Sequence, residues 1–474
     1  MKREDFKGKK VLVMGLGTHG GGAGTARFLS DSGAKVTVTD LKSEKDLGEP
    51  LNELRGLSIH YVLNGHHEDD FKNTDLIIRN PGVPVHSPYL AIAQKQSVPI
   101  ETDGSLFLKL CPSFTIGITG TKGKSTTTAL TTAMLRKGGV DAKACGLPGT
   151  SLLEALEDLK GKSVAVAELS SWQLEGITHE GKGPRVAVIT NVFADHLKDY
   201  PSFEAYREAK SRILLYQNRK DVAVLNLDDP NTPVLLKKIR GECSFFSGIS
   251  CEKMTGQKGI CISHDNIFFE DGGQEHMFSF IQSELSLRGP HNISNIAAAL
   301  CAIFSATRHS QWENVPFDPS AYQRAIKVFP GLEGRLEFIG MKEGVTYIND
   351  TAATNPGAVE AALKSIPQDT KIILICGGQD KGLEYHKLAE RIMQRVKYVI
   401  FLGGTATEKL YAALQKLNFI RTSQVFSDMQ SAVQAAKQLA ERGDIILLSP
   451  GAASFNLFAD EFARGRAFKN AVGL

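Results

Sequence analysis

The chain has 474 residues, too many for a single hydrophobic core, and this length predicts about three domains. Its hydrophobic content of 42% and charged content of 23% are ordinary for a globular protein. The net charge of +3 excludes a broad basic surface for nucleic acid or for an anionic membrane. The longest apolar runs have the length of strands, well below the roughly 20 residues of a membrane helix, so we expect no membrane insertion.

The cysteines and the N-terminus indicate the compartment. Seven cysteines are scattered along the chain without a CxxC pair. Their odd number and their spacing predict a reducing environment and argue against a disulfide framework or a zinc site. The first eight residues are rich in charge and lead into a strand, unlike a signal peptide. We therefore expect a cytoplasmic protein.

Short apolar strands alternate with amphipathic helices along most of the chain, which predicts α/β layers around mainly parallel sheets. The first predicted domain, residues 1–102, begins with a strand at 10–14 and the glycine turn 15–20. This turn, with Asp40 closing the next strand, matches the dinucleotide fingerprint. The same pattern also fits another nucleotide-like ligand or a structural strand–helix turn, and these alternatives stay open at this point.

The second predicted domain, residues 103–331, contains the glycine-rich segment 117–128, Gly-Ile-Thr-Gly-Thr-Lys-Gly-Lys-Ser-Thr-Thr-Thr. An apolar strand at 114–118 precedes it, and a helical segment follows. Glycines in this context let backbone N–H groups surround a phosphate at a helix N-terminus. We expect Lys124 to reach the β/γ-phosphates and Ser125 to hold Mg²⁺. The spacing departs from the usual P-loop, because Ile118 stands where that pattern has a glycine.

Two polar side chains follow neighbouring strands of this domain. Glu168 ends the apolar strand 164–167, and His196 comes soon after the strand 186–189. A carboxylate at the tip of a strand beside a phosphate turn is well placed to hold Mg²⁺. A histidine after a strand is more often structural, but these neighbours favour a functional role. By its own sequence context, Lys210 is typical of a solvated lysine on a helix.

The remaining segments complete the predicted organisation. Residues 242–287 lack a helical period and predict an antiparallel β insertion. A Pro-Gly break at 328–331 predicts a linker. In the third predicted domain, residues 332–474, strands are expected near 345–348, 371–375, 398–402 and 445–448.

Several further motifs occur in order along the chain: Gly120-Thr-Lys-Gly-Lys-Ser125, Glu168-Leu-Ser-Ser-Trp-Gln-Leu-Glu175, Asn191-Val-Phe-Ala-Asp-His-Leu197, His291-Asn-Ile-Ser-Asn295, Gly334-Arg-Leu-Glu337, Asn349-Asp-Thr-Ala-Ala-Thr-Asn355, Gly377-Gly-Gln-Asp-Lys-Gly382 and Leu448-Ser-Pro-Gly-Ala-Ala-Ser454. Their order and spacing resemble those of the Mur ligases, ATP-dependent amino-acid-adding enzymes of peptidoglycan synthesis. Within that family the chain looks most like the class that adds glutamate. The segments that begin at Glu168 and Leu448 are the class-specific ones.

The resemblance implies a three-domain α/β enzyme: a Rossmann-like N-terminal domain that binds UDP, a P-loop-type central ATPase domain, and a Rossmann-like C-terminal domain for the amino acid. In this family ATP phosphorylates the terminal carboxylate of the acceptor, here UDP-N-acetylmuramoyl-L-alanine. The amine of D-glutamate then attacks the acyl phosphate. Another amino acid, such as L-glutamate, or another acceptor is the alternative. The expected protein is a monomer whose partners are these small molecules.

The resemblance also assigns residues. The catalytic residues would be Lys124, Glu168, His196 and Lys210. Two Mg²⁺ ions would be held by Ser125, Glu168, His196 and a carbamylated Lys210, which replaces the solvated reading of that lysine. ATP would contact Gly120, Thr121, Lys122, Gly123, Lys124, Ser125, Thr126, Asn292, Asn295, Arg335 and Asp350. The UDP substrate would contact Gly17, Thr18, His19 and Asp40. The amino acid would contact Thr354, Lys381 and Ser454.

Rival classes fit the sequence less well. A GTPase switch would carry a base-reading Asn-Lys-x-Asp segment, which is missing in the right context. A protein that only binds a UDP-sugar would not need Glu168, His196 and Lys210 together. A folate-type ligase lacks the N-terminal UDP domain. Four departures from the family bear on substrate specificity more than on ATP chemistry: the extra residues 19–22 in the N-terminal turn, Leu147 near the acceptor site, Ala352 in the cleft, and Glu461 where an aromatic residue is expected.

Overall fold

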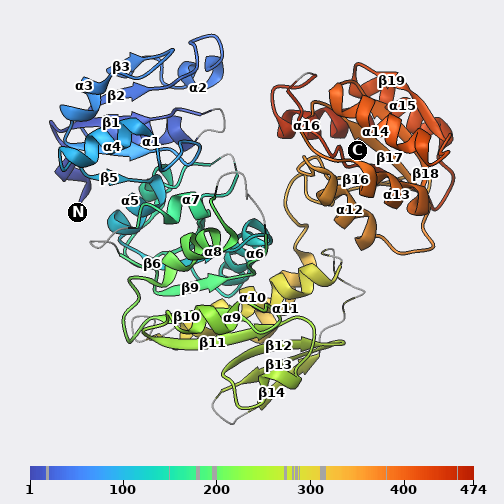
Figure 1. Cartoon of the computed structure of the whole chain (residues 1–474). Coiled ribbons are helices and arrows are strands. Elements are labelled where there is room, and N and C mark those ends of the chain that lie inside the picture. Colours follow the sequence, from blue (N-terminus) through green and yellow to red (C-terminus); the bar gives the residue numbers. More distant parts are fainter. Residues whose placement is uncertain are drawn as a thin grey trace. The chain divides into compact units, whose positions relative to one another are not determined.

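The computed structural model describes residues 1–17, 21–148, 150–177, 182–194, 200–271, 275–279, 282, 285, 287, 289–309, 317–380, 382–455 and 457–474. The chain divides into two compact units (Figure 1). The first unit comprises Met1–Ser283 and His291–Lys327, and the second comprises Glu284–Pro290 and Val328–Leu474. The first unit contains two sheets and the second contains one. None of the described helices is long and apolar enough to cross a membrane.

The N-terminal sheet is parallel, with the strand order β3-β2-β1-β4-β5. Its strands are β1 (Lys10–Met14), β2 (Lys35–Thr39), β3 (Ile59–Val62), β4 (Leu76–Arg79) and β5 (Ile100–Glu101). The flanking helices are η1 (Arg3–Phe6), α1 (Gly21–Asp31), α2 (Gly48–Asn52), α3 (Glu68–Lys72) and α4 (Pro88–Lys95). Alternate residues of β1 point to opposite faces, so Val11 and Val13 pack in the core with α1 while Leu12 and Met14 pack with α3 and α4. The strand order reverses between β1 and β4, where open α/β sheets bind ligands.

The central sheet has the strand order β14-β13-β12-β11-β10-β9-β6-β8-β7. Its strands are β6 (Phe114–Thr119), β7 (Ala142–Cys145), β8 (Val164–Glu168), β9 (Val186–Ile189), β10 (Val222–Asn226), β11 (Glu242–Ser247), β12 (Gly259–Ser263), β13 (Asn266–Glu270) and β14 (Glu275–Ser279). The helices around it are α5 (Asp103–Leu110), α6 (Lys124–Lys137), η2 (Glu154–Asp158), α7 (Ser171–Leu174), α8 (Phe203–Ser211), η3 (Arg212–Leu214), α9 (Thr232–Leu236), η4 (Glu252–Met254), α10 (Pro290–Thr307) and α11 (Pro319–Val328). The predicted strands at 114–118, 164–167 and 186–189 are thus confirmed.

The predicted antiparallel insertion at 242–287 is only partly right. β11 pairs in parallel with β10, and β12 pairs in parallel with β11. Only the β12–β13 and β13–β14 pairs are antiparallel. Consecutive apolar residues are buried in β11 (Phe245, Phe246) and in β12 (Ile260, Cys261, Ile262), as in parallel strands covered on both faces, whereas β13 alternates between buried and half-buried positions.

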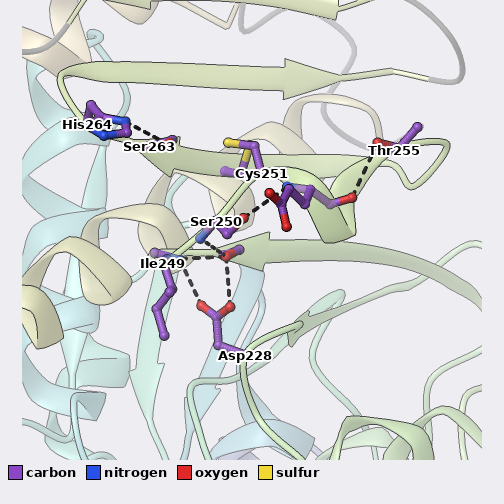
Figure 2. The surroundings of a disulfide bond; sticks show 11 residues. Asp228, Ile249, Ser250, Cys251, Thr255, Ser263 and His264 are labelled. Carbon is purple, nitrogen blue, oxygen red and sulfur yellow. Dashed lines mark hydrogen bonds between the residues drawn. A yellow bond between two sulfur atoms is a disulfide. The ribbon is translucent and has the colours of Figure 1, made fainter.

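The cysteine spacing argued against a disulfide framework, but the structure contains a disulfide. Cys251, in the loop after β11, is bonded to Cys261 of β12, with Cα atoms 5.4 Å apart (Figure 2). The parallel register sets Ser247 opposite Cys261, so the short return loop brings Cys251 back to that strand. The same loop is held by Asp228, whose carboxylate accepts hydrogen bonds from Ser247 Oγ (2.9 Å) and from the Gly248 amide (3.0 Å). The other five cysteines are free.

The sheet of the second unit has the strand order β15-β16-β20-β17-β18-β19, and only the β15–β16 pair is antiparallel. Its strands are β15 (Glu337–Lys342), β16 (Val345–Asn349), β17 (Ile372–Gly377), β18 (Val396–Leu402), β19 (Thr422–Phe426) and β20 (Ile445–Leu448). Its helices are α12 (Pro356–Ser365), α13 (His386–Arg395), α14 (Thr405–Lys416), α15 (Met429–Leu439) and α16 (Glu461–Val472). The core on one face of β17 includes α12, α13 and α14, and the core on the other includes α15 and α16. All four predicted strands are confirmed.

Candidate active site

The glycine-rich turn lies between the carboxyl end of β6 and the start of α6. Gly120 and Gly123 have φ angles of +153° and +85°. A Cβ atom on Gly120 would lie 1.9 Å from Thr190 Oγ1, and one on Gly123 would lie 2.2 Å from Asn295 Oδ1. Both positions therefore require glycine, for backbone conformation and for space.

Residues at the tip of β9 hold this turn in shape. Asn191 Oδ1 accepts a hydrogen bond from the Lys122 amide (2.9 Å), and Asn191 Nδ2 donates to Lys122 O (3.1 Å). Thr190 Oγ1 also donates to Lys122 O, at 2.7 Å, and the Thr121 amide donates to Asn191 O. No role was predicted from sequence for Thr190 or Asn191. Both residues come directly after β9, a neighbour of β6, and this position could have indicated that they contact the glycine turn.

Lys124, Ser125 and Thr126 form the first turn of the 14-residue helix α6. Lys124 Nζ lies 3.4 Å from Thr121 O, within the turn itself. Ser125 is buried, at 3% exposure. The first N–H groups of a helix have no intrahelical acceptor and face its positive dipole end, which favours an anion here.

Glu168 ends β8, in register with Ile118 of β6, the strand that leads into the turn. Its side chain is buried, and Oε2 accepts no hydrogen bond from any group in the described part of the chain. A buried carboxylate oxygen without a donor is destabilising unless a cation meets it. The position therefore fits a hard cation such as Mg²⁺, which prefers oxygen ligands.

The local sequence predicted that Lys210 of α8 is a solvated helix lysine. This prediction is wrong, because the side chain is only 2% exposed. Its Nζ donates to Gly120 O at 2.8 Å and lies 4.5 Å from the centre of the Tyr206 ring. Tyr206 Oη in turn donates to Thr121 Oγ1 at 3.3 Å. The structure thus brings Lys210 to the glycine turn. The local sequence gave no sign of this, and only the family resemblance predicted it.

The predicted metal site is only partly described. His196 lies outside the described residues, as do Thr18, His19 and Lys381. Among the residues that are described, no three His, Cys, Asp or Glu side chains gather as metal ligands. Of the four predicted metal ligands, Ser125, Glu168 and Lys210 are described, and Glu168 supplies the carboxylate.

Asn292 and Asn295 lie in the first turns of α10 and are buried. Asn295 Nδ2 donates to Asn292 Oδ1 at 3.0 Å, and Asn295 Oδ1 is 3.5 Å from Thr127 Oγ1 of α6. The pair therefore packs against the glycine turn. A cavity of about 360 Å³ lies beside the turn and is lined by Asn191, Val192, Phe193, Ala194, Phe203, Asn226, Asp228, Asp229, Pro230 and Asn231.

In the N-terminal sheet, Asp40 ties the end of β2 to the glycine turn after β1. Its Oδ2 accepts hydrogen bonds from the amides of Leu16 (2.8 Å) and Gly17 (3.4 Å), and its Oδ1 accepts from the Lys42 amide (2.9 Å). Asn80, which follows β4, reaches toward the same turn, with Nδ2 3.5 Å from Leu16 O. Asn80 therefore lies where the strand order reverses, and it was not predicted from sequence.

In the second unit, Asp350 follows β16 and is buried. It accepts hydrogen bonds from Ser449 Oγ (2.7 Å) and the Leu336 amide (3.1 Å). Burial raises the pKa of Asp350 to about 7, although these bonds and the charge of Arg335 act in the opposite direction. Arg335 itself is exposed.

The predicted amino-acid ligands Thr354 and Ser454 lie on two loops of this unit, which follow β16 and β20. The loops touch, since the Gly451 amide donates to Ala353 O at 2.8 Å. Thr354 is half-buried and Ser454 is buried.

Three family models match the chain: a MurD-like N-terminal domain of Mur ligases over residues 9–102, the Mur ligase middle domain over 118–303, and the Mur ligase glutamate ligase domain over 334–451. The chain therefore belongs to the Mur ligase family. Its three-domain α/β architecture is that of the family. The bounds predicted from sequence, 1–102, 103–331 and 332–474, stay predictions.

Individual members of the family are similar to this chain over nearly its whole length. The chain is 41% identical to a UDP-N-acetylmuramoylalanine–D-glutamate ligase of Roseiflexus sp. (strain RS-1) over 98% of each chain. It is 36% identical to the ligase of that name from Geobacter metallireducens, over 99% of this chain and 98% of the relative. Among solved structures, the UDP-N-acetylmuramate–alanine ligase MurC of Thermotoga maritima shares the fold, with a TM-score of 0.59 at 18% identity over 98% of this chain and 99% of that one.

Proposed function

We propose that this chain is an ATP-dependent ligase that joins D-glutamate to UDP-N-acetylmuramoyl-L-alanine in peptidoglycan precursor synthesis. The full-length relatives of that name support the substrates. The observation that carries the chemistry is the glycine turn at Gly120, flanked by the buried Lys210 and by a Glu168 oxygen that has no hydrogen-bond partner among the described residues. A protein that only binds nucleotide has no need for both.

In the proposed reaction, an oxygen of the acceptor's terminal carboxylate attacks the γ-phosphorus of ATP, and ADP leaves. The product is an acyl phosphate. The amine of D-glutamate attacks its carbonyl carbon, the amine gives up a proton, and inorganic phosphate leaves as the amide forms. The turn, the N-terminus of α6 and Lys124 would orient the triphosphate and stabilise the charge on the transferring phosphoryl group.

The proposal includes Mg²⁺ bound through Ser125, Glu168, His196 and a carbamylated Lys210. When bound, the metal neutralises negative charge on the phosphates. A carbamate on Lys210 adds anionic oxygens and leaves one N–H on Nζ, so the bond to Gly120 O is compatible with the modification. The burial of Lys210 beside the turn supports this assignment.

The remaining assignments belong to the same proposal. Thr354, Lys381 and Ser454 would hold the carboxylates of the amino acid, and the turn at Gly17 with Asp40 would lie at the UDP group. ATP would also contact Asn292, Asn295, Arg335 and Asp350. We further propose that the enzyme is a monomer acting in the cytoplasm, where ATP and nucleotide-linked substrates are dissolved.

Phosphate release tests the proposed substrates directly. The protein is incubated with ATP, Mg²⁺ and UDP-N-acetylmuramoyl-L-alanine while single amino acids are added in turn. We expect release that depends on D-glutamate and on the acceptor. Release with L-glutamate alone would favour the alternative ligase, and no response to any amino acid would refute the assignment.

A further inference from the structure

Arg464, in the first turns of α16, is a buried cation that the proposed reaction does not use. Its side chain is 1% exposed. Nε donates to Thr351 Oγ1 at 3.1 Å, Nη2 donates to Thr351 O at 2.9 Å, and Nη1 donates to Ala452 O at 3.1 Å. Burial lowers its pKa to about 10, so the guanidinium is still charged at neutral pH.

The three bonds of Arg464 join two different loops. Thr351 lies on the loop after β16, between Asp350 and Thr354, and Ala452 lies two residues before Ser454 on the loop after β20. Thr351 makes a further bond to the same helix, since its Oγ1 donates to Glu461 O at 2.7 Å. Next to Arg464, a Cβ on Gly465 would lie 2.8 Å from Thr351 Cγ2, so α16 approaches this loop closely.

Arg464 matters less for the position of Asp350 than for the positions of Thr354 and Ser454. Asp350 has independent anchors in Ser449 and the Leu336 amide. No side-chain hydrogen bond to Thr354 or Ser454 is present within the described residues. The segments that carry them are joined by the Arg464 fork and by the backbone bond from the Gly451 amide to Ala353 O. Loss of the fork would therefore disturb the spacing of Thr354 and Ser454 more than the position of Asp350.

We propose that Arg464 is a positioning residue for the incoming amino acid, whose guanidinium fixes the loop of Thr354 relative to the loop of Ser454. This inference rests on the proposed function, in which those two side chains hold the amino acid's carboxylates. A planar guanidinium can make all three bonds at once from fixed directions, and a lysine ammonium cannot.

Steady-state kinetics of Arg464→Lys and Arg464→Met test this. Hydrogen bonds to a charged group contribute about 1.5–3 kcal/mol, so we expect the KM for D-glutamate to rise about 10- to 100-fold in Arg464→Met. Arg464→Lys keeps the charge and should show a smaller rise. The KM for the UDP-linked acceptor should stay within about twofold, because its proposed site lies in the first unit. Arg466→Met, an exposed arginine two residues away on the same helix, is the matched control and should leave both KM values unchanged.

The outcomes separate the two proposals. If the wild-type protein shows no glutamate-dependent turnover, the proposed function fails, and with it the role of Arg464. If the wild type turns over and Arg464→Lys keeps the wild-type KM for glutamate, the positioning role is refuted while the function stands. An equal rise in both KM values, or a lower melting temperature with unchanged kinetics, would show a merely structural arginine. Arg464→Lys decides the question should Arg464→Met fail to fold.

Discussion

At the scale of single residues, the candidate site is marked by polar groups that the fold alone does not explain. Oε2 of Glu168 is buried and accepts no hydrogen bond from any described residue, and Lys210 is buried with its Nζ donating to Gly120 O of the glycine turn. A buried carboxylate oxygen without a donor lowers the stability of a free protein unless a ligand meets it. Stability lost at one place and recovered on binding is characteristic of a functional site.

Glu168→Gln tests the role of this carboxylate. The variant removes the charge and keeps the volume, so we expect its activity to fall about 100-fold or more and its Mg²⁺ requirement to rise. Its thermal stability without ligands should equal or exceed that of the wild type, because a buried unpartnered oxygen loses its charge. Activity is measured against Mg²⁺ concentration. Wild-type activity and Mg²⁺ dependence in the variant would remove Glu168 from the site.

Lys210→Ala tests the proposed carbamate. We expect activity to be lost, and short carboxylic acids added to the assay should restore part of it by supplying anionic oxygens in the vacated space. Lys238→Ala is the control. It breaks a surface ion pair with Glu208, which lies on α8 like Lys210, and the variant should stay active. An active Lys210→Ala protein would exclude the carbamate.

Asp350 makes stability depend on pH. Burial raises the pKa of its carboxyl from the ordinary 3.8 to about 7 in the folded protein. Between these values the folded state binds more protons than the unfolded state, so the stability contributed by Asp350 falls as the pH rises through this window. Asp350→Asn removes the ionisation. Denaturant unfolding should show a gain in its stability over the wild type that grows from pH 5 to pH 8, whereas a constant difference would contradict the shifted pKa.

At the scale of elements, the strands whose own residues form an apolar run were predicted correctly from sequence. The apolar runs at 186–189 and 445–448 became β9 and β20 with the same bounds. The insertion at 242–287 was misjudged, because the direction in which β11 and β12 pair depends on distant neighbours and not on their own residues. The disulfide was missed for the same reason, since the register of β11 and β12 brings Cys251 to Cys261.

The disulfide makes a prediction of its own. It joins residues 10 apart, and a bond that closes a loop of this length stabilises a fold by about 2–3 kcal/mol. Oxidised Cys251→Ser should therefore unfold at a lower denaturant concentration than the oxidised wild type, and a reductant should abolish the difference. Cys243→Ser, at a free cysteine, is the control for side-chain replacement. Equal midpoints under oxidising conditions would argue against the bond.

At the scale of the whole molecule, the sequence predicted three blocks, and the first two form one compact unit. A buried ion pair joins them: Arg79, at the end of β4, donates to Glu175 Oε2 at 3.0 Å and to Trp172 O at 2.9 Å. Arg79 looks unremarkable in sequence, and Glu175 was noted only as the last residue of a family motif. Pairing between distant segments is what a single sequence shows least.

In the candidate site, too, residues marked by local pattern could be predicted from sequence, and residues placed by distant contacts could not. The turn at Gly120 and the carboxylate at Glu168 could be predicted from local pattern, because strand ends and glycines carry a signal. Lys210 and the ligands of the second unit could be placed only by resemblance, and Arg464 by neither. A helix residue gives no local sign of which distant loop its side chain reaches.

The transfer of an oxygen atom tests the central claim, that this site phosphorylates a carboxylate and then replaces the phosphate by an amine. The acceptor UDP-N-acetylmuramoyl-L-alanine is prepared with ¹⁸O in both oxygens of its terminal carboxylate and is turned over with ATP, Mg²⁺ and D-glutamate. The account predicts that each released phosphate carries one ¹⁸O and that the amide product keeps the other. Phosphate without ¹⁸O, released while both substrates are present, would contradict it.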